Sequence, residues 1–212
     1  MVQKELSLIR KVFIFIYFVS LGCVQPVGNK TAIYFEKVDL STIKNDTISI
    51  KSPRLTLRNG IYFLDNRPYS GFIKTKYENE ALKNISSCLD GKQHGIAKSF
   101  FVNGKLETIR NYRNGLSYGL HYGYWSNGNK KFEFQYFNDK REGIQKQWYE
   151  SGNQYYELTF SDDRENGMQQ AWRENGNIYI NYEVKDGIRY GLQKTALCYT
   201  LNNEKLKWKI AS

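Results

Sequence analysis

The chain has little proline, methionine and histidine, and no hydrophobic run long enough to cross a membrane as a helix. Its 212 residues include 3 Pro, 2 Met and 2 His. The apolar run at residues 12–19 is well short of the roughly 20 residues that a spanning helix needs. Scarce proline, together with 17 Tyr and 12 Phe, favours many short strands over helices.

Residues that usually carry catalysis are also scarce. The two histidines are His94 and His121, and no C-x-x-C, H-E-x-x-H or P-loop spacing is present. Acidic residues cluster at Asp162, Asp163 and Glu165, where turns select such residues for conformational reasons. We therefore predict a protein that is not an enzyme and that needs no metal and no cofactor.

Positive charge exceeds negative charge, but it is spread along the chain. The formal net charge is +10, from 31 Lys and Arg against 21 Asp and Glu, and no run of basic residues is longer than two. Such a surplus suits nucleic acid or an anionic membrane surface, and it equally suits an ordinary solvated surface. We favour the solvated surface. The export signal described next argues against a nucleic-acid partner.

The start of the chain has the features of an export signal. A positively charged stretch with Lys4, Arg10 and Lys11 precedes the apolar run. The run is followed by Ser20-Leu21-Gly22-Cys23, which resembles the lipobox of bacterial lipoproteins. Gly22 and Cys23 match that pattern, whereas Ser20 and Leu21 depart from it. An ordinary secretory signal or an N-terminal strand are the alternatives.

The resemblance to a lipobox implies an address and an anchor. It predicts a signal peptide over 1–22, lipid attachment at Cys23 and a tether over 23–30. The mature protein would be a membrane-anchored lipoprotein of the bacterial cell envelope, in the periplasm or on the cell surface.

Glycines recur at a fixed interval through most of the chain. Their spacing is 24 residues without insertion, at Gly71, Gly95, Gly119, Gly143, Gly167 and Gly191. Turn dipeptides recur between them in two sets. The first set is Asn103-Gly104, Asn127-Gly128, Ser151-Gly152 and Asn175-Gly176, after a degenerate Asn79-Glu80. The second set is Asp90-Gly91, Asn114-Gly115, Asn138-Asp139, Asp162-Asp163 and Asp186-Gly187. Two reversals in each interval predict two strands, so the repeat is a β-hairpin.

Apolar residues alternate with polar ones in the second strand of each interval. Phe132, Phe134 and Tyr136 alternate with polar residues, and the next interval repeats the pattern. In the first strand, apolar residues stand one and five positions after the glycine, as in the pairs Ile96 and Phe100, Leu120 and Tyr124, Ile144 and Trp148, and Met168 and Trp172. A neighbouring column is Tyr77, Phe101, Trp125 and Tyr149, and it ends at Arg173. We expect both columns to form core ladders across the sheet.

These residues resemble a known repeat family. The segments 95–104, 119–128 and 143–152 share a leading Gly, an aromatic pair and a closing Asn-Gly or Ser-Gly, and they are similar to the bacterial variant of the MORN repeat. The resemblance implies an all-β fold, an elongated single-layer antiparallel meander of 24-residue hairpins. The resemblance says little about the biochemical activity of the protein. Some bacterial members are classed as YwqK-type, antitoxin-like components, and eukaryotic relatives act in scaffolding, membrane association and dimerisation.

The repeats need structure at both ends. We predict capping strands over 31–70, with strands at 47–50, 55–57 and 61–64 and a turn at Asn59-Gly60. Repeats occupy 71–199, and 200–212 form a C-terminal cap, in which 197–208 are a closing strand or a short helix. Cys88 and Cys198 fall nine strands apart, on the order of 40 Å, which predicts no disulfide between them.

A single-layer sheet with an aromatic face leaves that face uncovered, and this predicts an interface. We expect an envelope-anchored scaffold that binds an unknown protein partner, another copy of itself or the membrane. The candidate binding face comprises Tyr124, Trp125, Trp148, Tyr149 and Trp172. Two alternatives stand beside this function: an antitoxin-like component, and a carbohydrate-binding surface in which Trp125, Trp148 and Trp172 stack on sugars.

Overall fold

A computed structural model of the protein describes residues 38–192, 200–202 and 205–207. These residues form strands, turns and loops, without a helix among them. The strands are β1 (Thr47–Ser49), β2 (Leu55–Arg58), β3 (Ile61–Leu64), β4 (Arg67–Pro68), β5 (Gly71–Lys76), β6 (Leu82–Leu89), β7 (Lys92–Phe100), β8 (Leu106–Arg113), β9 (Leu116–Ser117), β10 (Gly119–Tyr124), β11 (Lys130–Phe137), β12 (Lys140–Arg141), β13 (Gly143–Trp148), β14 (Gln154–Ser161), β15 (Arg164–Trp172), β16 (Ile178–Lys185), β17 (Ile188–Leu192), β18 (Thr200–Asn202) and β19 (Lys205–Lys207). The predicted all-β class is confirmed.

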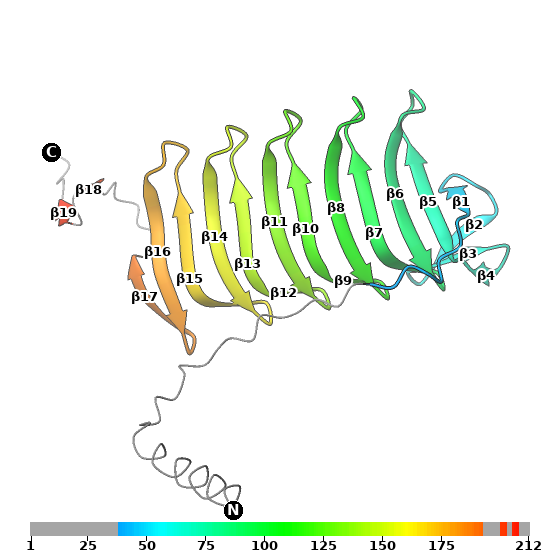
Figure 1. Ribbon diagram of the computed structural model, residues 1–212. Coiled ribbons are helices and arrows are strands. Elements are labelled where there is room, and N and C mark those ends of the chain that lie inside the picture. The colour runs from blue at the N-terminus through cyan, green and yellow to red at the C-terminus, as the bar shows by residue number, and fades with distance from the viewer. Residues whose placement is uncertain (1–37, 193–199, 203–204, 208–212) are drawn as a thin grey trace, which may run out of the picture. The chain divides into compact units, whose positions relative to one another are not determined.

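Fourteen strands join into one open sheet (Figure 1). The order along it is β1-β5-β6-β7-β8-β10-β11-β13-β14-β15-β16-β17, and the short strands β9 and β12 pair with β8 and β11. Neighbouring strands are antiparallel except β1, which runs parallel to β5. From β5 onward the strands follow one another in sequence order, as expected for a meander.

Two kinds of tight turn lie at the two edges of this sheet. At the lower edge in Figure 1, both central residues of each turn have positive φ, for example 49° at Asn138 and 66° at Asp139. That combination is typical of type I′ turns. At the upper edge the Gly104 N–H donates to the Phe101 carbonyl at 2.8 Å, and Gly104 alone in that turn has a positive φ, 81°. The predicted turn dipeptides therefore stand at the turns.

The strand register divides the side chains between two faces. Phe132, Phe134 and Tyr136 pair with Gly123, His121 and Gly119, and we call the face on which they lie the aromatic face. The predicted alternation of these three residues is confirmed.

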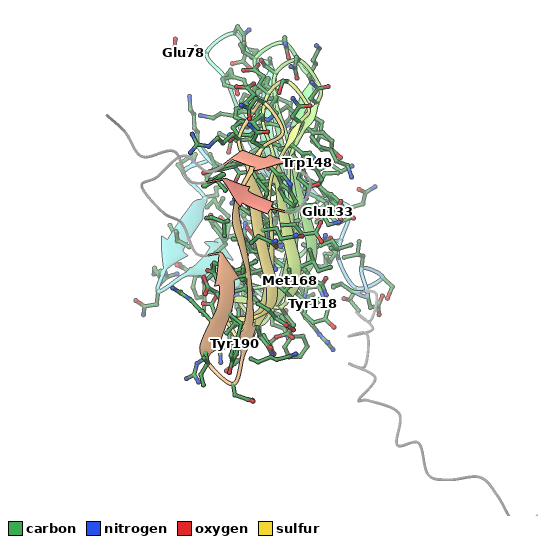
Figure 2. All side chains as sticks on the ribbon, turned by 90° about the vertical axis from the view of Figure 1, so that its left-hand side faces the viewer. Glu78, Tyr118, Glu133, Trp148, Met168 and Tyr190 are labelled. Atoms are coloured by element: carbon green, nitrogen blue, oxygen red, sulfur yellow. The ribbon has the colours of Figure 1, made fainter. Side chains whose placement is uncertain are left out.

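The opposite face, here the charged face, carries Tyr122 beside Glu133 and Lys146 beside Glu157. Figure 2 looks along the sheet, with side chains standing on both of its sides.

The Phe132 ring of the aromatic face lies over Gly123 of the neighbouring strand. A Cβ added at Gly123 would overlap the ring of Phe132, so only glycine leaves room for that ring. The Phe132 and Phe134 rings stack with centroids 4.6 Å apart, and Phe134 stacks on Tyr156 at 6.4 Å. These contacts bury much of the aromatic face without a second layer of strands.

The expected core ladder one residue after each glycine is wrong. Ile96, Leu120, Ile144 and Met168 are 36–44% exposed and lie on the charged face. The buried column stands one residue later and is mostly small or polar, at Ile73, Ala97, His121, Gln145 and Gln169. The physical reason is the pairing. Leu120 stands opposite Gln135, whereas His121 stands opposite Phe134 on the aromatic face.

The buried polar side chains replace missing backbone pairing between successive hairpins. Strands β11 and β13 pair only at Phe132 with Gln147 and at Glu133 with Lys146. Below that point the Gln145 carboxamide takes over, because its Nε2 donates to the Gln135 carbonyl at 2.9 Å and its Oε1 accepts from the Gln135 N–H at 3.1 Å. The side chain of Gln145 thus imitates a peptide group.

His121 and Gln169 occupy the same place at their own boundaries. His121 Nε2 bonds to the Asn111 carbonyl at 2.8 Å, and Gln169 Nε2 donates to the Thr159 carbonyl at 2.7 Å. The Oε1 atom of Gln169 has no partner among the described residues.

A small three-stranded sheet packs against the first hairpin. Strands β2, β3 and β4 lie where capping strands and an Asn59-Gly60 turn were expected. Tyr69, Ile73 and Cys88 form a buried cluster, against which Tyr62 and Leu64 of this sheet pack. Burial raises the pKa of the Cys88 thiol to about 11. This end of the sheet therefore has a true apolar core.

Several predictions fall largely or wholly outside the described residues. The signal peptide, Cys23 and the tether lie there, and so does Cys198, so the structure does not test the absence of a disulfide. Of residues 197–208, β18 and β19 pair as a two-stranded sheet, which agrees with strand and not with helix in those six residues.

Candidate functional site

The described residues contain no arrangement that points to metal chemistry or to a membrane helix. No group of three or more His, Cys, Asp or Glu side chains in this part of the chain could hold a metal ion. No helix among the described residues is long and apolar enough to cross a membrane.

The acidic cluster at the lower edge forms ion pairs between hairpins. Asp162 pairs with Lys140 and Asp163 with Arg141, both at 2.5 Å, and Glu165 pairs with Arg189 at 2.9 Å. The Arg141 guanidinium lowers the pKa of Asp163. These carboxylates link neighbouring hairpins, which is a structural role.

One catalytic spacing escaped the sequence reasoning. Residues Gly115 to Gly119 spell G-x-S-x-G around Ser117, the spacing of a hydrolase nucleophile. That motif needs a sharp turn from a strand into a helix, whereas Ser117 lies in the short strand β9. Its N–H donates to Asp139 Oδ1 at 2.6 Å, and His121 is bonded elsewhere. In this chain the G-x-S-x-G spacing belongs to the turn at Asn114-Gly115 and to the short strand that follows it.

The five residues predicted as a binding face separate into two groups. Trp125 and Tyr149 clamp successive hairpins, because Trp125 Nε1 donates to the Trp148 carbonyl at 3.1 Å and the Tyr149 hydroxyl donates to the Trp172 carbonyl at 2.9 Å. The Tyr77 hydroxyl makes the corresponding bond to the Phe100 carbonyl at 2.8 Å. Trp125 and Tyr149 therefore have a structural task.

Tyr124, Trp148 and Trp172 end strands on the charged face, near the upper edge. All three are half-buried. Figure 2 labels Trp148 together with Glu133 and Met168, which belong to the same face. A recurring amide bond holds the adjacent turns, since Asn129 and Asn153 donate to the carbonyls of Glu150 and Glu174, both at 2.9 Å.

Lysines cover several rings near the upper edge. Lys131 Nζ lies 4.4 Å from the centroid of the Trp125 ring, and Lys130 Nζ lies 5.4 Å from that of Trp148. A shallow hollow opens beside Trp172, lined by Asn153, Gln154, Trp172, Glu174, Asn175 and Gly176. Sequence reasoning singled out Trp172 but missed this hollow, because the turn residues around it look like turn residues only.

An exposed aliphatic row was also missed. Ile96, Leu120, Ile144 and Met168, the aliphatic row from here on, lie on alternate strands, 40%, 36%, 42% and 44% exposed. Their cross-strand partners are Asn111, Gln135, Thr159 and Glu183, of which the first three are uncharged. Strict alternation along the first strand could have predicted the row, because residues one position after the glycine must lie on the opposite face from the glycine and from the residue two positions after it.

Comparison with known proteins adds no relative. No protein-family model matches the chain, and no curated protein matches it.

Proposed function

We propose that this protein is a non-enzymatic scaffold of the bacterial envelope, built from 24-residue hairpins of the MORN type and anchored by lipid on Cys23. The regular glycine spacing supports the repeat. So do the bonds between successive hairpins, since the clamps at Tyr77, Trp125 and Tyr149 each join residues 23 apart.

The observation that carries the scaffold function is the aliphatic row. Four large aliphatic side chains stand exposed in line across alternate strands of one face, about 10 Å apart from one to the next. Exposed apolar side chains that gather on one face mark interaction sites, in contrast to ones that are scattered singly. The intervening Asn111, Gln135 and Thr159 carry no charge that would oppose burial. We therefore propose that the protein-binding surface is this row, and not the set of aromatic residues that sequence alone favoured, Tyr124, Trp125, Trp148, Tyr149 and Trp172.

Site-specific photocrosslinking tests this surface. A photoreactive phenylalanine analogue at Leu120 or Ile144 of the full chain should give adducts with the partner in intact cells. The control is the same analogue at Val102, which is 59% exposed but lies in an upper-edge turn. Adducts at Val102 as abundant as those at Leu120, or none at the row, would overturn the proposal. An adduct of twice the chain mass would identify the partner as a second copy.

Metabolic labelling with a palmitate analogue tests the anchor. The wild type should be labelled and should sediment with membranes, and Cys23→Ser should lose both properties. An unlabelled wild type in the cytoplasm would remove the envelope address and would turn attention to the antitoxin-like role.

A further inference from the structure

Rings near the upper edge of the sheet are accompanied by lysines from the same chain. Lys83 Nζ lies 5.3 Å from the centroid of Tyr77, and Lys131 and Lys130 lie over Trp125 and Trp148. An ammonium over an aromatic ring is attracted by the negative potential of the ring face, by about 0.5–2 kcal/mol depending on exposure. These rings therefore already hold ammonium groups, which the lysines of the same chain supply.

Trp172 departs from this arrangement. Trp148 and Trp172 are 24 residues apart, and so are Lys130 and Gln154, so Gln154 stands where Lys130 stands for Trp148. The local geometry agrees, because Lys130 Nζ pairs with Glu133 at 3.0 Å and Gln154 Nε2 donates to Glu157 at 3.2 Å. Gln154 is uncharged. Among the described residues, no Lys or Arg side chain lies over the Trp172 ring.

The space beside Trp172 is the hollow described above. Two of its lining residues are joined, because Asn153 Nδ2 donates to the Glu174 carbonyl at 2.9 Å. Glu174, an exposed residue, lines the same hollow and brings a negative charge to this part of the surface. An indole face and a carboxylate together favour a cation over a neutral ligand.

We propose that this hollow binds an aliphatic ammonium group, primary or quaternary, over the ring of Trp172 and beside Glu174. The group comes from a ligand, and it fills the place that Lys130 fills over Trp148. A lysine side chain of another protein and a choline-like headgroup share this chemistry. This site is separate from the aliphatic row and does not depend on the scaffold function.

Titration with small probes tests the site directly. The full chain is labelled with ¹⁵N at its 4 tryptophans, and the indole signals are followed by NMR. Choline should shift the Trp172 signal and bind about tenfold more tightly than 3,3-dimethylbutan-1-ol, its neutral isostere, as expected for a partly desolvated cation–π contact. Equal binding of the two probes would overturn the proposal, and so would a response to a methyl glycoside alone, which would mark a sugar site. N-acetyl-lysine methylamide, compared with choline, separates the protein source from the headgroup source.

Two reciprocal substitutions sharpen the test. Gln154→Lys supplies the internal ammonium and should weaken choline binding at Trp172 at least fivefold. Lys130→Gln removes the internal ammonium from Trp148, beside which Glu150 matches Glu174, and should create a second choline response there. Both changes copy a residue that the chain already carries at a matching place, so both variants should fold, and thermal unfolding checks this. Unchanged binding in folded Gln154→Lys would overturn the proposal.

Discussion

The boundary between β6 and β7 and the boundary between β11 and β13 meet the same backbone problem with different side chains. At both, a side chain adds hydrogen bonds to backbone groups of the ladder. At β11–β13 the carboxamide of Gln145 bonds to both the N–H and the carbonyl of Gln135. At β6–β7 the matching buried residue is Ala97, and the hydroxyl of Ser87 lies 2.6 Å from the His94 carbonyl and 3.1 Å from that of Ile96.

The difference teaches that a buried polar residue in this sheet is part of the backbone ladder. Unpaired buried backbone groups are costly, so each boundary must supply a donor or an acceptor from somewhere. The substitution that removes two bonded atoms should therefore cost more than one that removes a single bond.

Gln145→Leu should have the largest effect. It leaves the N–H of Gln135 unpaired, which costs about 1–3 kcal/mol. It also removes one of two donors to the Gln135 carbonyl, which keeps its bond from the Glu142 N–H at 3.0 Å. We expect a loss of about 2 kcal/mol in the free energy of unfolding, measured by urea denaturation. Gln170→Leu is a control, because Gln170 Nε2 bonds to the Asn181 side chain and not to backbone. Equal losses in the two variants would contradict the ladder interpretation.

Ser87→Ala should have an intermediate effect. One hydroxyl donor to the buried His94 carbonyl is lost, so we expect a loss of about 1–1.5 kcal/mol. Ser99→Ala is the matched control, since Ser99 bonds to the Thr108 hydroxyl within one hairpin. A smaller loss for Ser87 than for Ser99 would argue against a special role at the boundary.

Gln169→Leu should cost less than Gln145→Leu. Its Oε1 already lacks a partner, so the substitution removes an unsatisfied buried atom together with the bond to the Thr159 carbonyl. We expect a loss of about 1 kcal/mol or less by the same denaturation. A loss as large as that of Gln145→Leu would indicate that Oε1 is bonded through water.

His121→Gln should have the smallest effect at neutral pH and should remove a pH dependence. Burial lowers the pKa of His121 below its ordinary 6.5, and the positive charge of Arg110 acts in the same direction, against the bond to the Asn111 carbonyl and the charge of Asp139. The folded state thus favours the neutral ring. The contribution of His121 to the free energy of unfolding is therefore fully present above about pH 6.5, and it is lost as the pH falls through the lowered pKa. Thermal unfolding at pH 7.5 and pH 5 should show a larger drop for the wild type than for the variant. Equal drops would mean that His121 does not titrate differently on folding.

The sequence alone predicted the turns and the second strands because both depend on local chemistry. Positive φ selects Asn, Asp and Gly, and a half-buried strand selects alternation, as at Phe132 and Phe134. The sequence alone failed at Ile144 and Gln145, because an aliphatic residue is expected to be buried and an amide to be exposed, whereas the structure has the opposite. Gln145 is buried because its side chain bonds to the backbone of Gln135, ten residues earlier in the chain. A pattern of hydrophobic residues does not contain that information.

The candidate site was predictable to a similar extent. Trp172 stood out as a large aromatic residue, but its departure from Trp148 depends on Gln154, a residue whose meaning appears only beside Lys130. The tasks of Trp125 and Tyr149 were hidden because their partners are carbonyl groups, which every residue has.

The clamps bear on how the chain reaches its folded state. The bonds from Tyr77, Trp125 and Tyr149 each end on the next hairpin, and the lower-edge ion pairs join residues 22 to 24 apart. Each hairpin can therefore complete its contacts as soon as about two dozen more residues are free to fold. A chain with such short-range links can acquire structure progressively, one hairpin after another, without waiting for its last residue.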